Sequence, residues 1–173
     1  MRRFTGMVLA AAVLAMAACT PAEQEQAEGT PSMRATMPDT TAASLWAHLK
    51  AADYSANWPL WPGKSELYTG TQPHGMLLTT YVNDGALDAL TSKAGTMPAG
   101  AIVVKENYMP DSMLAAVTIM YKVAGYNAAF GDWFFVKRLA DGTVEAQGRV
   151  GGCQGCHTQR ADNDYLFTGS LSQ

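Results

Sequence analysis

The chain has 173 residues, of which 48% are hydrophobic and 16% are charged, and its formal net charge is −3. This length suits one domain of ordinary size with a buried core, and the small acidic charge argues against binding to the phosphate backbone of nucleic acids. Beyond residue 20 there is no apolar run of the about 18 residues that a membrane-spanning helix needs, so a multispan membrane protein is excluded.

Residues 1–18 are typical of a secretory signal peptide of the lipoprotein type. Arg2 and Arg3 precede an apolar stretch that is short for a bilayer span, and small residues lead up to Cys19. The site resembles the lipobox of bacterial lipoproteins, in which the cysteine is acylated and becomes the mature N-terminus. The alternative is ordinary cleavage near Ala17, which would leave Cys19 as an incidental thiol. Because Thr20 rather than an aspartate follows Cys19, we expect a periplasmic protein that is lipid-anchored to a bacterial outer membrane.

Residues 19–41 predict a disordered tether, because they are rich in Ala, Glu, Gln, Thr and Pro and contain almost nothing to bury. The functional domain is therefore expected to span residues 42–173. It opens with apolar residues at roughly helical spacing between Leu45 and Tyr54, and Thr41 or Ser44 is the expected N-cap.

Five segments rich in β-branched and aromatic residues follow, and short turns connect most of them. The predicted strands are 75–82, 101–108, 114–123, 132–139 and 143–150, with a short helix over 85–93 after the first strand. Short turns favour antiparallel pairing. The predicted fold class is α+β, an antiparallel β-sheet with an N-terminal helix and a C-terminal helical segment.

The strongest motif is Cys153-Gln154-Gly155-Cys156-His157, which is the C-x-x-C-H attachment signature of c-type haem. Thiols at this spacing add across the two vinyl groups of a porphyrin, and the adjacent imidazole reaches the iron. We therefore expect one haem c, covalently attached through Cys153 and Cys156, with His157 as an axial ligand of the iron. The C-terminal helical segment is expected to bind this haem.

Other interpretations of the motif explain less. A structural zinc site needs four ligands, and outside the motif only His48 and His74 remain, with no second C-x-x-C. A thioredoxin-like redox pair would open a helix early in a βαβ unit. A simple disulfide would leave His157 without a role.

The sixth coordination position of the iron is not assigned by the motif. An electron carrier usually has its haem motif near the start of the domain and a methionine ligand well after it, and this chain lacks that order. His74 could also ligate the iron, but an isolated histidine that precedes a glycine is more typical of a structural residue. The methionines of the domain are more typical of core filler: Met76, Met97, Met109, Met113 and Met120. We expect five-coordinate iron with an open site that binds and transforms small molecules.

A haem motif at the C-terminus of a β-rich domain resembles the cytochrome P-460 family and its sister group, cytochrome c′-beta. The resemblance runs from about Trp46 to Phe167. It rests on segments that occur in a fixed order: Tyr81-Val82-Asn83, the turn with Pro98 and Gly100, Val103-Val104-Lys105-Glu106, Trp133-Phe134-Phe135, the haem motif, and Asp164-Tyr165-Leu166-Phe167.

In its P-460 branch the family implies a haem macrocycle that is cross-linked to a lysine, which Lys105 matches here, and oxidation of hydroxylamine. The alternative is that Lys105 is a strand lysine that forms a salt bridge or extends to solvent. Family enzymes also carry an arginine and a carboxylate on the distal side, at positions where this chain has Leu78 and Thr118. With Met120 and Phe134 beside them, these residues predict a largely apolar pocket, which is closer to the c′-beta group. Glu106 is a substitute base, although strand alternation directs it to the opposite face.

Three functions follow as hypotheses. The first is an oxidoreductase for hydroxylamine or nitric oxide, in which Lys105 modifies the ring, Thr118 or Glu106 moves a proton, and a periplasmic electron-transfer protein receives the electrons. The second is a haem protein that binds nitric oxide or similar gases without turnover. The third is a methionine-ligated electron carrier. Relatives are often dimers, so a homodimer is a further expectation from the resemblance.

Overall fold

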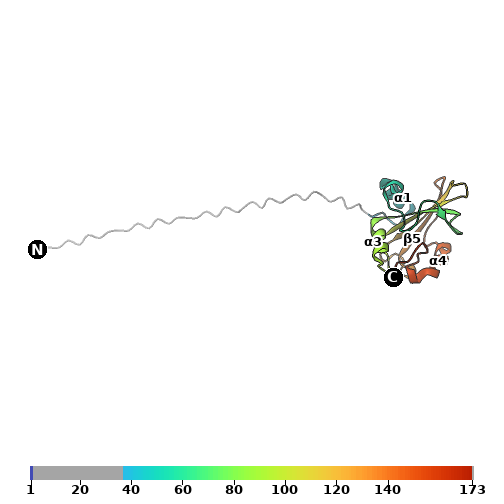
Figure 1. Ribbon diagram of the computed structural model, residues 1–173. Coiled ribbons are helices and arrows are strands. Elements are labelled where there is room, and N and C mark those ends of the chain that lie inside the picture. Colours follow the sequence, from blue (N-terminus) through green and yellow to red (C-terminus); the bar gives the residue numbers. More distant parts are fainter. Residues whose placement is uncertain (2–36, 173) are drawn as a thin grey trace. The chain divides into compact units, whose positions relative to one another are not determined.

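The computed structural model describes Met1 and residues 37–172. The chain divides into two units, Met1–Arg34 and Ala35–Gln173, and the helices and strands named below belong to the second unit (Figure 1). The predicted signal peptide, Cys19 and residues 19–36 of the predicted tether lie outside the described residues. None of the described helices is long and apolar enough to cross a membrane.

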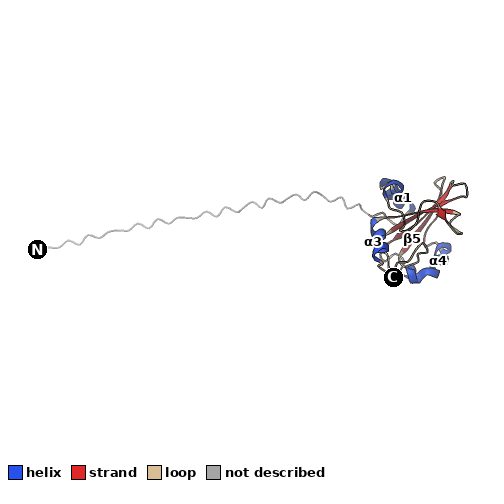
Figure 2. Ribbon diagram, in the orientation of Figure 1, coloured by secondary structure: helices blue, strands red, loops and turns tan. Residues whose placement is uncertain are grey.

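One six-stranded sheet forms the centre of the domain, with its strands in sequence order and all neighbouring strands antiparallel (Figure 2). Five strands match the predicted ones to within about two residues at each end, and the sixth, β1, is too short to give a sequence pattern. The α+β fold class is confirmed. The strands are β1 (Tyr68–Thr69), β2 (Leu77–Val82), β3 (Ile102–Tyr108), β4 (Leu114–Lys122), β5 (Trp133–Leu139) and β6 (Val144–Gly148).

Side-chain caps set where the two longer helices begin. The Thr41 Oγ1 accepts a hydrogen bond from the Ser44 N–H at 3.1 Å at the start of α1 (Ala42–Ala51). The Asn83 Oδ1 caps α3 (Asp84–Ser92) in the same way, and it also accepts from the Ile102 N–H at 2.9 Å. This shared oxygen ties the start of α3 to the start of β3.

The remaining helices are short. The helix α1 ends before Tyr54 because Asp53 adopts the left-handed conformation (φ 45°), after which α2 (Tyr54–Asn57) begins. The C-terminal segment is helical as predicted, with α4 (Gly151–His157) followed by the 3₁₀ helix η2 (Thr158–Asn163). A second 3₁₀ helix, η1 (Ala128–Phe130), precedes β5.

The sheet separates two hydrophobic cores, because alternate residues of a strand point to opposite faces. The α1-side core lies between the sheet and α1 with α2; its buried members include Leu45, Leu49, Tyr81, Ile119 and Phe134. The α3-side core lies between the sheet and α3 with the C-terminal residues; its buried members include Val82, Leu90, Val103, Trp133 and Leu166.

Asp164 joins the C-terminal segment to the sheet. Its buried carboxylate accepts hydrogen bonds from the Lys122 Nζ at 2.5 Å and from the Met97 N–H at 2.7 Å. The indole Nε1 of the fully buried Trp133 donates to the Asp164 carbonyl at 2.9 Å, and the Lys122 ammonium lies 4.8 Å from the centre of the same indole ring. These contacts, here called the Asp164 clasp, hold the residues after η2 against β4 and β5.

We predict that Asp164→Asn lowers the free energy of unfolding by about 3 kcal/mol, because it leaves the nearly buried Lys122 ammonium without its counter-ion. Denaturant unfolding of the purified protein measures this change. Glu145→Gln is the control, since the Lys137–Glu145 pair is largely exposed and its loss should change the free energy by less than about 1 kcal/mol. Equal effects of the two substitutions would contradict the role given to the clasp.

Candidate haem site

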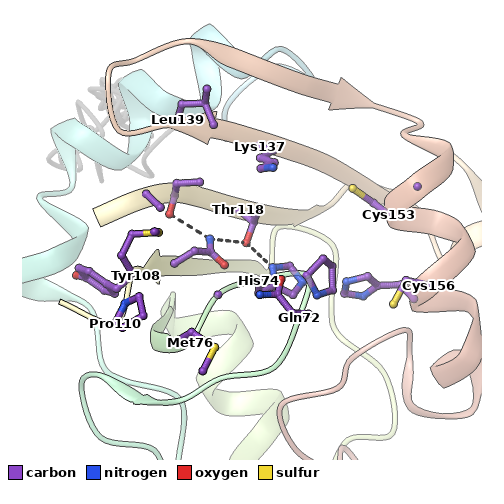
Figure 3. A pocket seen from close by; sticks show the side chains of 18 residues that line it. Gln72, His74, Met76, Tyr108, Pro110, Thr118, Lys137, Leu139, Cys153 and Cys156 are labelled. Carbon is purple, nitrogen blue, oxygen red and sulfur yellow. Dashed lines mark hydrogen bonds between the residues drawn. The ribbon is translucent and has the colours of Figure 1, made fainter. Parts of the chain in front are cut away.

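A cavity of about 530 Å³ lies between α4 and one face of the sheet (Figure 3). Its walls come from the loop 72–76, from β3, β4 and β5, and from α4, which contributes Cys153, Cys156 and His157. A smaller cavity of about 40 Å³ continues on the other side of the two histidines His74 and His157, which line both cavities.

Helix α4 brings the three residues of the C-x-x-C-H motif to this cavity. Cys153 and Cys156 are both free thiols, and both are partly buried at the cavity wall. Burial raises the pKa of the Cys153 thiol, so this cysteine is not held as a thiolate. The two thiols lie on one side of the pocket in Figure 3, opposite the strands that carry Thr118 and Lys137.

His157 is buried and has a fixed ring orientation. Its Nδ1 donates a hydrogen bond to the Tyr165 carbonyl at 2.6 Å, which leaves Nε2 as the nitrogen with a free lone pair. Burial lowers the pKa of His157; the hydrogen bond to Tyr165 opposes this shift and the charge of Lys105 adds to it, so the net effect favours the neutral imidazole. A histidine whose second ring nitrogen donates to a backbone carbonyl is the usual arrangement of a metal ligand.

These residues fit a haem c. The chemistry requires two thiols at this spacing, one imidazole with a free nitrogen next to them, and a mainly apolar space that can take the ring. The cavity volume falls in the range of cofactor sites, about 300–1,000 Å³. The Phe135 and Phe167 rings lie 5.4 and 5.5 Å from the His157 ring and give the site an apolar surround.

Lys105 lies on the cavity side of β3, opposite Thr118 of β4. Burial, together with the charge of Lys64, lowers the pKa of Lys105 to about 8. Lys105 in turn lowers the pKa of both His74 and His157, so its amine acts electrostatically on both imidazoles. Within the described residues Lys105 forms no salt bridge, in contrast to the interpretation of a lysine held by an acidic partner.

A hydrogen-bond network centred on Thr118 crosses the cavity wall (Figure 3). The Thr118 Oγ1 accepts from the Asn107 Nδ2 at 3.2 Å and lies 3.3 Å from the His74 Nδ1 and 3.4 Å from the Lys105 carbonyl oxygen. The Asn107 Nδ2 also donates to the carbonyls of Lys105 and Ala116, whereas its Oδ1 is buried without a hydrogen-bond partner.

Three of the residues expected in the pocket are placed elsewhere. Glu106 lies on the α1-side face, where it accepts from the Tyr54 and Tyr108 hydroxyls at 2.8 and 2.6 Å and cannot serve the haem side as a base. Phe134 is buried in the α1-side core, and the next residue, Phe135, takes the place beside His157. Leu78 is on the cavity side of β2 but is covered by Gly70 and lines neither cavity.

One residue of the site was not predicted, and another was considered as an iron ligand but interpreted as structural. Asn107 follows Lys105 by two positions on β3, so strand alternation alone could have placed both on one face. His74 belongs to the loop before β2, and burial, followed by the charges of Lys105 and His157, lowers its pKa to about 4. No periodic pattern marks a loop residue, so the sequence carried no signal for its position.

Comparison with known proteins agrees with this arrangement. The family model described as Cytochrome P460 matches residues 51–168, a span that includes β1 to β6, Lys105 and the complete C-x-x-C-H motif. No curated protein matches the chain. Since the family match covers well over half of the sequence, the chain belongs to the cytochrome P460 family, as its resemblance to that family predicted.

Proposed function

We propose that this haem c protein is an enzyme that oxidises hydroxylamine, with the haem bound between α4 and the sheet. Cys153 and Cys156 would each hold the haem by a thioether bond, in which the sulfur adds to one vinyl carbon, the thiol proton goes to the other, and no group leaves. The Nε2 of His157, which the Tyr165 hydrogen bond leaves free, would hold the iron. When bound, the haem supplies an iron centre that takes up electrons one at a time.

The position of Lys105 carries the proposal. Its amine is partly buried beside the cavities, close enough to act on both imidazoles, and its pKa of about 8 makes the neutral, nucleophilic form accessible near neutral pH. We infer that the Lys105 Nζ is bonded to a carbon of the haem macrocycle. Forming this N–C bond would remove one hydrogen from each atom, and an external two-electron oxidant of the peroxide class would take up both hydrogens and be reduced.

Asn107 supports hydroxylamine as the substrate over nitric oxide. Its buried Oδ1 lacks a hydrogen-bond donor among the described residues, although a buried acceptor normally has one. Hydroxylamine brings N–H and O–H donors into the cavity, whereas nitric oxide brings none. Its oxidation releases equal numbers of protons and electrons; the Thr118 hydroxyl, 3.2 Å from the Asn107 amide, is placed to pass on the protons. The electrons go to an external electron-transfer protein.

The covalent attachment can be tested directly. We predict that wild-type protein made in a host that matures c-type cytochromes keeps its haem under denaturing conditions. Cys153→Ala combined with Cys156→Ala should abolish this retention, because both thioether bonds are lost. Haem staining after denaturing electrophoresis measures it, and retained haem in the double variant would contradict the assignment of these thiols.

The role of Lys105 can be tested by spectrum and turnover together. We predict that the ferrous Soret band of the wild type is broad and red-shifted, and that Lys105→Leu gives an ordinary c-type spectrum and only background oxidation of hydroxylamine. Glu106→Gln is the matched control: it changes the neighbouring residue on the opposite face and should keep both spectrum and turnover.

Two results would argue against the enzyme. Full turnover in Lys105→Leu would remove the lysine from the reaction. Tight binding of nitric oxide by the ferrous wild type without any hydroxylamine turnover would favour a gas-binding protein, for which the apolar residues of the smaller cavity, such as Val103, Met120 and Phe135, are suited.

We also propose that the protein is exported and anchored by lipid at Cys19, on the basis of the sequence from Arg2 to Thr20. The intact mass of material purified from membranes should correspond to a chain that begins at an acylated Cys19. Cys19→Ala should abolish the lipid mass and release the protein from the membrane fraction. A wild-type mass that begins at Ala18 or Thr20 without lipid would refute the anchor.

A further inference from the structure

His74 faces His157 across the site. Few residues line both cavities, and His74 and His157 are two of them. The two ring centroids are 6.2 Å apart, and the ring planes are nearly perpendicular, at 87°. A metal–imidazole bond is about 2.0–2.1 Å long, so two imidazoles on opposite sides of one metal ion have centroids about 6 Å apart. The observed spacing is therefore that of two ligands of the same ion.

The hydrogen bonds of His74 leave the correct nitrogen free. Thr118 can donate one hydrogen bond and accept two. When its hydroxyl donates to the Lys105 carbonyl, its two lone pairs accept from the Asn107 Nδ2 and from the His74 Nδ1. His74 then carries its proton on Nδ1 and has its lone pair on Nε2, as His157 does. A hydroxyl or carbonyl that accepts from the second nitrogen is the usual support of a ligating histidine.

The methionines are less well placed than His74. Met76 and Met109 line the larger cavity only and are about half exposed, at 51% and 52%. Met113 is more exposed still, and Met97 belongs to the α3-side core. Met120 lines the smaller cavity only. Among the described residues, His74 is thus better placed than any of these methionines to be the second ligand of the iron.

We propose that His74 is the sixth ligand of the haem iron in the resting protein, and that a substrate or gas reaches the iron by displacing it. The inference rests on the proposed binding of haem through His157, and it replaces the expected five-coordinate iron by a bis-histidine centre. The loop 70–76, which carries His74 between Gly70 and Gly75, is the element that must move. Because His74 competes, the apparent affinity for small molecules is the intrinsic affinity multiplied by the fraction of protein in which His74 is displaced.

The test uses the full-length, haem-loaded protein and does not depend on turnover. Electron paramagnetic resonance and absorption spectra of the ferric wild type should show low-spin iron with two nitrogen ligands. His74→Ala should give high-spin iron, and added imidazole should restore the low-spin spectrum, which separates loss of a ligand from loss of the fold. His48→Ala is the matched control, because His48 belongs to α1 and packs against Trp58. The spectrum of this variant should equal that of the wild type.

Carbon monoxide binding to the ferrous protein gives an independent readout. We expect the apparent affinity to rise by about tenfold or more in His74→Ala and to stay unchanged in His48→Ala. High-spin ferric iron in the wild type, or a low-spin spectrum that persists in His74→Ala, would overturn the inference. Either result leaves the proposed function standing, whereas absence of covalent haem from the wild type would refute the proposed function itself.

Discussion

The site depends on the hydrogen bond from His157 to the Tyr165 carbonyl, and the chain presents this carbonyl only through an unfavourable backbone turn. Asp164 and Tyr165 are consecutive non-glycine residues with positive φ, 50° and 67°, a conformation that surrounding contacts must maintain. The Asp164 clasp supplies these contacts from the sheet, and the Tyr165 N–H donates to the Arg160 carbonyl at 2.7 Å. Gly131 completes the support, because a Cβ at that position would lie 2.6 Å from the Tyr165 ring. The orientation of one imidazole thus draws on residues from four separate segments.

The two histidines are supported unequally, and this difference assigns them different roles in the proposal. The support of His157 is a carbonyl at 2.6 Å in a buried and tightly held segment, whereas His74 has a hydroxyl at 3.3 Å and sits on a loop. Of two ligands that share an ion, the one with the weaker support exchanges first. The cavity face of β3 and β4 lies on the His74 side. Thr118, which would meet an incoming substrate together with Asn107, is therefore also the residue that holds the ligand this substrate displaces.

Sequence patterns predicted the parts of this protein that are set by local chemistry. The cap at Thr41, the turns, and the strand limits follow from neighbouring residues, and the C-x-x-C-H spacing reflects the porphyrin it serves. The register of β5 was not predictable in this way. Trp133 to Val136 are all buried, so the strand lacks the polar alternation that would show which of Phe134 and Phe135 faces the haem side. The position of His74 could not be predicted for another reason, since it is set by the path of the loop before β2.

The division into two cores has a consequence for how the holoprotein is assembled. The α1-side core is filled by the protein's own side chains. Beside the α3-side core there is a cavity, which a haem would fill. The last strand, β6, ends before the haem motif begins, so synthesis completes the sheet first and delivers α4 last. Before attachment, α4 and η2 have fewer groups to pack on than the strands and should open at a lower free energy than the sheet. The C-terminal helix would then be the element that lets the cofactor in, and the proposed thioether bonds would hold this helix on the sheet afterwards.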